Sequence, residues 1–190
     1  MNFETLRLMS QDYADRYQEP SALPATIDTM AYAYQRICQG EDPWTALGDF
    51  SNAWYGYAKH IRPDLIKDPL TRPEQETERT RHWDAFCAAS VEYLCELFHQ
   101  PCPKWALDPY YILATPWWNM LRPHDPDAQA YFRKITPPAF ARRNIFCSNR
   151  LYQNKYEMYK WIQEAIVKGM TDVHEIQRYA RQKQISLYGA

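Results

Sequence analysis

Glycine is scarce in this chain, with only 5 among 190 residues. The five glycines form no glycine-rich loop of the kind that cradles nucleotide phosphates, which removes the simplest route to nucleotide binding. No apolar run approaches the roughly 20 residues that a membrane-spanning helix needs. The opening segment MNFETLRLMSQDYADRYQ carries charges where a signal peptide would be apolar. These absences predict a soluble protein in the cytoplasm that is not inserted in a membrane.

Cysteine and histidine are also few, and their spacing matches no catalytic or metal-binding pattern. Five cysteines, an odd number at irregular spacing, favour free thiols in a reducing compartment over a disulfide framework. The five histidines belong to no local catalytic motif, and no C-x-x-C pair indicates zinc. Cys95, His99 and Cys102 form the most metal-like group, although Cys95 lies in an apolar stripe where a small buried thiol is ordinary. We therefore expect a non-enzymatic protein with no catalytic residues, metal or cofactor.

Apolar and aromatic residues, by contrast, are plentiful, at 46% and 15% of the chain. This content is enough to offset the conformational entropy lost on folding. The apolar residues recur at steps of three and four, which is the helical period. The pattern predicts an all-α fold with helices at 2–18, 25–40, 41–60, 73–99, 154–169 and 171–185. We expect the helix at 73–99 to be central, with the N-terminal helices packed on it.

Residues 101–138 have a different character, because prolines recur every few residues among tryptophans and tyrosines. Long helices and strands cannot run through that spacing. We expect a long, ordered, aromatic-rich loop over the helical core, with short helices after Pro109 and Pro126. The predicted organisation is a helical core domain at 1–150, which includes this loop, and a basic C-terminal helical hairpin at 151–190.

The net charge of −1 conceals an uneven distribution. Residues 133–190 carry eleven basic and four acidic side chains, or +7, so that residues 1–132 hold −8. This asymmetry indicates either an anionic partner or two regions of the chain that attract each other.

Nucleic acid is one such partner, because lysines and arginines interleaved with aromatic residues could attract phosphates and stack on bases. The terminal hairpin alone, however, is an incomplete version of a three-helix DNA-binding element. The candidate residues for this alternative are Lys155, Lys160, Arg178, Arg181 and Lys183.

The segment TPPAFARRNIFCSNR, residues 136–150, lies at the border between the acidic and basic parts. Its prolines predict a helix start, and Phe140 and Phe146 are expected to anchor the segment in the core. Arg142 and Arg143 fall outside this apolar set, so we expect them to face either a partner or water.

Three stretches of the chain resemble a group of small bacterial proteins. These stretches are GEDPWTALGDFSNAW, WDAFCAASVEYLCELFHQPCPKW and PPAFARRNIFCSNR, and the resemblance covers about residues 40–150. Many proteins of that group are encoded beside nucleotidyltransferase-type proteins of the abortive-infection toxin–antitoxin class. The resemblance implies an antitoxin-like neutraliser or regulator of such a partner, with a role in phage defence, rather than an enzyme.

An antitoxin-like protein of this kind would act by occlusion, covering the active cleft of its partner. A nucleotidyltransferase cleft contains carboxylates, and arginines held on a rigid turn can pair with carboxylates bidentately. We predict Arg142, Arg143 and Arg150 for this contact. Exposed aromatic residues would serve as anchors, because interface energy concentrates in Trp, Tyr and Arg, and for these we predict Trp117, Trp118 and Tyr152.

Overall fold

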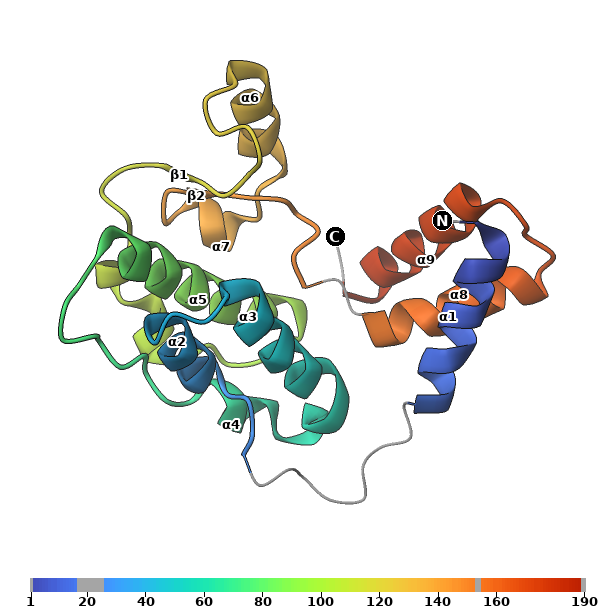
Figure 1. Cartoon of the computed structure of the whole chain (residues 1–190), viewed down its shortest axis with the longest axis horizontal. Helices are drawn as coiled ribbons and strands as arrows, with labels where there is room; N and C mark the ends of the chain where they lie inside the picture. Colours follow the sequence, from blue (N-terminus) through green and yellow to red (C-terminus); the bar gives the residue numbers. More distant parts are fainter. Residues whose placement is uncertain (1, 17–25, 153–154, 189–190) are drawn as a thin grey trace.

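The computed structural model describes residues 2–16, 26–152 and 155–188 (Figure 1). These residues form a mostly helical structure, as the periodicity predicts, and the strands among them are two short ones. The α-helices are α1 (Phe3–Arg16), α2 (Met30–Cys38), α3 (Pro43–Asn52), α4 (Arg62–Ile66), α5 (Glu78–Leu97), α6 (Pro126–Ile135), α7 (Pro138–Ala141), α8 (Lys155–Val167) and α9 (Val173–Tyr188). A π-helical turn η1 (Ala53–Tyr57) extends α3, and the 3-10 turns are η2 (Lys59–Ile61), η3 (Lys104–Leu107) and η4 (Pro109–Tyr111).

Capping residues set where the helices begin. Asp42 accepts a hydrogen bond from the Thr45 amide at the start of α3, as the sequence predicts. The predicted start of α5 at residue 73 is wrong, because this helix begins at Glu78. Thr77 and Thr80 bond each other's backbone amides in a capping box, which satisfies the first free donors at that point.

Helix α5 is the centre of the larger hydrophobic cluster, which confirms the central position predicted for it. Helices α2 and α7 and the turns η3 and η4 pack directly on α5, and α3 packs on α2. The bulkiest fully buried side chains in this cluster are aromatic: Trp54, Tyr34, Phe50, Phe86 and Phe140. The predicted anchors Phe140 and Phe146 are both buried.

Helix α1 does not join that cluster, although we expected the N-terminal helices to pack on α5. It packs on α8, which in turn packs on α9 (Figure 1). A second hydrophobic cluster fills the space between the three helices, with Leu6 from α1 meeting Trp161 and Ile162 from α8 and Ile176 and Ala180 from α9. The C-terminal hairpin is therefore part of a three-helix unit that is completed by the other end of the chain.

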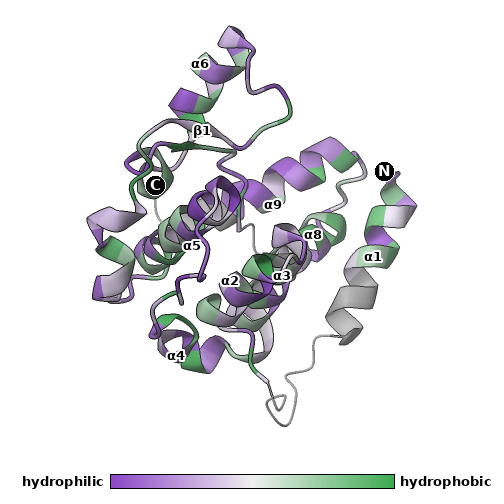
Figure 2. Cartoon of the chain, turned by 60° about the vertical axis from the view of Figure 1, so that its left-hand side comes forward, coloured by the Kyte–Doolittle hydropathy of each residue, from purple (hydrophilic) through white to green (hydrophobic). Residues whose placement is uncertain are grey.

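The proline-rich region 101–138 is ordered and contains the two predicted short helices, η4 and α6. Between them lies the strand β1 (Trp117–Trp118), which pairs in parallel with β2 (Ile145–Phe146). Helix α6 stands out from the rest of the molecule in both views of the chain (Figures 1 and 2). We call residues 119–135, which comprise the loop before α6 and α6 itself, the arm.

Candidate interaction surface

Glu92, on α5, is a buried carboxylate that binds two consecutive arginines. One of its oxygens accepts from Arg142 and the other from Arg143. Arg142 also reaches the carboxylate of Glu96, 3.2 Å away and one turn further along α5. Arg143 is only 3% exposed and donates to the backbone oxygens of Ala139 and Ala106 as well. The two arginines therefore fasten the segment after α7 to α5 and η3.

This arrangement corrects the prediction for Arg143, whose buried guanidinium faces neither a partner nor water. Arg142 keeps about half of its side chain exposed, 49%, but its guanidinium is shared between two carboxylates of the same chain. Of the two explanations for the charge asymmetry, attraction between regions of the chain operates here, because both arginines lie in the basic part and Glu92 in the acidic part. Arg150 is exposed, and its role in partner binding stays a prediction.

Trp117 and Trp118 point to opposite faces, as neighbouring residues of a strand must. Trp117 packs inward: it stacks on His82 with ring centroids 4.6 Å apart and meets Trp83 edge to face at 5.3 Å. Trp118 stacks on Phe146 at 4.4 Å, on the side where α6 is attached. Trp117 thus serves packing, whereas Trp118 lies at the base of the arm.

Tyr152 is also engaged with the core. Its backbone is left-handed, with φ 58°, and its carbonyl oxygen accepts a hydrogen bond of 2.6 Å from the Tyr55 hydroxyl. Burial raises the pKa of the Tyr152 hydroxyl well above its ordinary value. These contacts leave Tyr152 less surface for a partner than the sequence suggested.

The arm exposes apolar side chains that sequence reasoning did not single out. No residue of α6 is buried, Leu121 in the preceding loop is fully exposed at 102%, and Tyr131 is 57% exposed. Asp125 caps α6 by accepting from the amides of Asp127 and Ala128. Because aromatic residues under a long loop usually serve packing, the whole region 101–138 was expected to cover the core. The closely spaced Pro123 and Pro126 around a polar turn mark a turn in the chain here, but they do not indicate that the segment leaves the core.

The base of the arm is positively charged. The guanidinium of Arg133 lies over the ring of Trp118 at 4.8 Å and over that of Phe146 at 5.0 Å. Lys134 beside it is exposed. Cation–π contacts of this kind hold the arginine in place while its charge stays near the surface. Trp118 and Arg133 therefore form an aromatic and cationic patch where the arm meets the core, and Lys134 adds a second exposed cation at the same end of α6.

The cations proposed for nucleic acid lie on α8 and α9 and are only partly available. Lys160 and Arg178 are exposed, Arg181 is half-buried, and the side chain of Lys155 lies outside the described residues. Glu164 accepts from Lys168 at 2.7 Å, and Lys183 lies 3.7 Å from the same oxygen. The three-helix unit thus neutralises part of its own positive charge.

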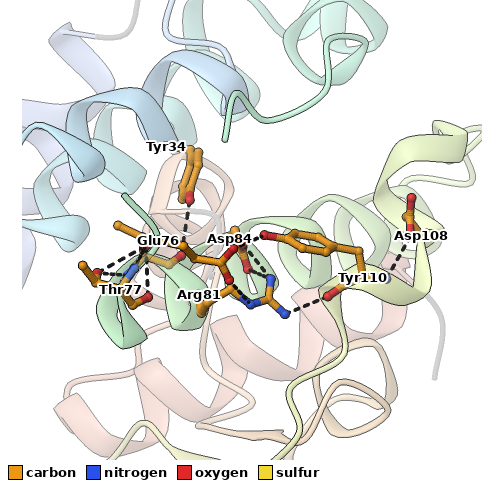
Figure 3. A network of polar contacts seen from close by, with 8 residues as sticks. Tyr34, Glu76, Thr77, Arg81, Asp84, Asp108 and Tyr110 are labelled. Atoms are coloured by element: carbon orange, nitrogen blue, oxygen red, sulfur yellow. Dashed lines mark hydrogen bonds and ion pairs between the residues drawn. The ribbon is translucent and has the colours of Figure 1, made fainter. Parts of the chain in front are cut away.

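A buried carboxyl group with a raised pKa, that of Asp84, lies near the start of α5 (Figure 3). Arg81 donates to both oxygens of Asp84 and, at 2.8 Å, to the Tyr110 carbonyl oxygen, and it forms an ion pair with Glu76 at 3.0 Å. Burial raises the pKa of Asp84 from 3.8 to about 6, although Arg81 opposes the shift. Only 4% of the Asp84 side chain is exposed, so a substrate has little access to it. The network ties the segment before α5 to η4, which is a structural role.

In the part of the chain that the structure describes, no group of three or more His, Cys, Asp or Glu side chains is arranged to hold a metal ion. No helix among those described is both long and apolar enough to cross a bilayer.

Comparisons with protein-family models, with curated proteins and with solved structures found no match.

Proposed function

We propose that this chain is a non-catalytic interaction protein that binds a protein partner through the arm. The observation that carries the proposal is the exposure of Leu121 and Tyr131 on an element that stands away from the core (Figure 1). Exposed apolar residues on a projecting element are costly in water and gain most by entering a groove of a partner. Tyrosine in particular is enriched among residues that dominate interface energy.

The charges beside the arm indicate the chemistry of the partner. Arg133 and Lys134 are exposed at the base of the arm, and Arg150 is exposed further along the chain. They favour a partner whose groove is apolar inside and acidic at its rim, since complementary charge orients and accelerates association. The carboxylate-containing cleft of a nucleotidyltransferase-type toxin has this character. The resemblance in sequence makes such a toxin, encoded by a neighbouring gene, the partner that we propose, with neutralisation by occlusion of its cleft.

Co-expression with the product of the neighbouring gene tests this function. We expect the two proteins to elute together from a size-exclusion column in a stoichiometric complex and the partner to lose its transferase activity in that complex. Separate elution at micromolar concentrations would contradict the proposal. Turnover of a substrate by the purified chain would contradict its non-catalytic part.

A nucleic-acid-binding regulator is the second candidate, because α1 supplies the third helix that the hairpin alone lacks. Exposed Lys160 and Arg178 would contact phosphates in this case. This candidate predicts that affinity for a labelled duplex or single strand falls steeply with salt and that Arg178→Ala reduces the salt slope. Affinity that is absent at low salt would eliminate it.

A further inference from the structure

The exposed side of α6 carries a row of four residues, which we call the outer stripe. Its members are Asp127, Ala130, Tyr131 and Lys134. They are three or four positions apart, which places them on one face of the helix, and all four are exposed. Because α6 stands out from the rest of the molecule (Figures 1 and 2), another molecule can reach this face.

The outer stripe has opposite charges at its two ends. Asp127 lies in the first turn of α6 and Lys134 in the last, with about 10 Å of helix between them. No ion pair within the described part of the chain involves either side chain, whereas the neighbouring Asp125 is paired with Arg122 at 3.1 Å. Both charges of the outer stripe are therefore available to another molecule.

The order of residues along the outer stripe is complementary to its own reverse. In an antiparallel pair of α6 helices with a two-fold axis between residues 130 and 131, Asp127 faces Lys134 of the second copy. Ala130 then faces Tyr131 of the second copy, and the small alanine leaves room for the ring. Opposite charges attract at both ends of this arrangement. A parallel pair would instead bring like charges together, which is unfavourable.

We propose that two copies of this chain associate through the outer stripe in an antiparallel, two-fold symmetric contact. A stable protein interface buries roughly 1,200–2,000 Å². Helix α6 has ten residues and is about 15 Å long, so that two such helices bury less than this area. The dimer is therefore weak, with a Kd of about 0.1–1 mM.

The dimer covers Tyr131, which is also the proposed contact with the protein partner. Self-association and binding of that partner therefore exclude each other, and the weak dimer protects the exposed apolar surface until the partner replaces it. This consequence rests on the proposed function, whereas the dimer itself does not.

Sedimentation equilibrium of the full chain tests the dimer. We expect the average mass to rise from 22.6 kDa toward twice that value as the protein concentration approaches about 1 mM. Added salt should reverse the rise in part, because it screens the ion pairs. A mass that stays at that of the monomer over this range would overturn the proposal and leave the proposed function intact. A dimer that forms although the neighbouring gene product is not bound would contradict the proposed function alone.

Charge-reversed variants test the antiparallel contact. The outer stripe has two positive charges in Asp127→Lys and two negative charges in Lys134→Asp, so each variant alone should remain monomeric where the wild type dimerises. An equimolar mixture of the two should dimerise again, because every lysine of one variant then faces an aspartate of the other. This recovery requires a folded α6 in both variants, so it also controls for unfolding.

Lys160→Asp is the matched control, since it makes the same change of charge at an exposed position on α8. It should dimerise like the wild type. Dimerisation of either single outer-stripe variant to the wild-type extent, or a mixture that stays monomeric, would contradict the antiparallel contact. Loss of the dimer in Lys160→Asp would show that association does not depend on α6 in the way proposed.

Discussion

The carboxylate of Glu92 and the guanidinium of Arg143 form an ion pair inside the core, between residues 51 positions apart in the chain. Their side chains are 6% and 4% exposed. Two buried charges of opposite sign compensate each other only while both are present, because the desolvation cost of each is large. The pair therefore helps to hold the 138–147 segment on α5, together with the Arg142–Glu96 pair and the packing of Phe140 on Phe86.

Glu92→Gln should destabilise the fold strongly, because it leaves Arg143 buried without its counter-charge. We expect a loss of about 3–5 kcal/mol in the free energy of unfolding, measured by urea denaturation. Glu96→Gln is the matched control on the same helix. Its pair with Arg142 is about half exposed, so the loss should be within about 1 kcal/mol. Equal losses in the two variants would show that the buried pair contributes no more to stability than the half-exposed one.

Aromatic residues of the core and of the arm should respond differently to truncation. Phe140 is fully buried, and Phe140→Ala should cost about 3–5 kcal/mol of stability. Tyr131 on α6 is mostly exposed, and Tyr131→Ala should change stability by no more than about 0.5 kcal/mol. Thermal denaturation of the two variants provides the comparison. A large loss in Tyr131→Ala would mean that the arm is held by the core and is not a free surface.

Asp84 should make stability depend on pH between about 4 and 6. Because its pKa is raised in the folded protein, from 3.8 to about 6, the folded state retains a proton that the unfolded state releases in this range. Its contribution to stability is complete below about pH 4 and is lost as the pH rises through about 6. Urea titrations across this window should show that the free energy of unfolding of the wild type falls as the pH rises, and that this fall is missing in Asp84→Asn. The same pH slope in both proteins would contradict the assignment.

The second hydrophobic cluster predicts that α1 stabilises α8 and α9. Leu6→Ala removes a buried contact with that cluster and should cost about 2–5 kcal/mol locally. Hydrogen exchange should therefore become faster in α8 and α9 while the protection of α5 is kept. Val167→Ala, at a position 86% exposed on α8, should leave the exchange unchanged. Unchanged protection of α8 and α9 in Leu6→Ala would contradict the role of α1.

Local signals in the sequence were sufficient to predict the helical class and several boundaries. Two helix starts are marked by an aspartate followed by proline, Asp42–Pro43 and Asp125–Pro126. The aspartate side chain accepts a hydrogen bond from a free backbone amide of the first turn, and the proline has no amide proton that would need an acceptor. The start of α5 was misplaced because Pro73 and the following glutamates carry the same signal as Thr77, where the capping box forms.

Contacts between distant segments could not be predicted in the same way. The partners of Arg143 lie 51 and 37 residues away in the chain, and nothing in the segment ARR indicates that its second arginine points inward. The packing of α1 on α8 joins opposite ends of the chain, although each helix has an ordinary apolar stripe. The exposure of Leu121 likewise depends on where the loop leaves the core, because a leucine between Met120 and Arg122 fits either environment.

The central claim, that the arm binds a protein partner, is tested most directly by the affinity of arm variants for the neighbouring gene product. Isothermal titration calorimetry should show that the double substitution Leu121→Ser and Tyr131→Ser weakens binding by about 2 kcal/mol or more, which is roughly thirtyfold in Kd. Val167→Ser, at an exposed apolar position on α8, should bind like the wild type. An unchanged Kd in the arm variant, with a folded protein and an intact wild-type complex, would contradict the claim.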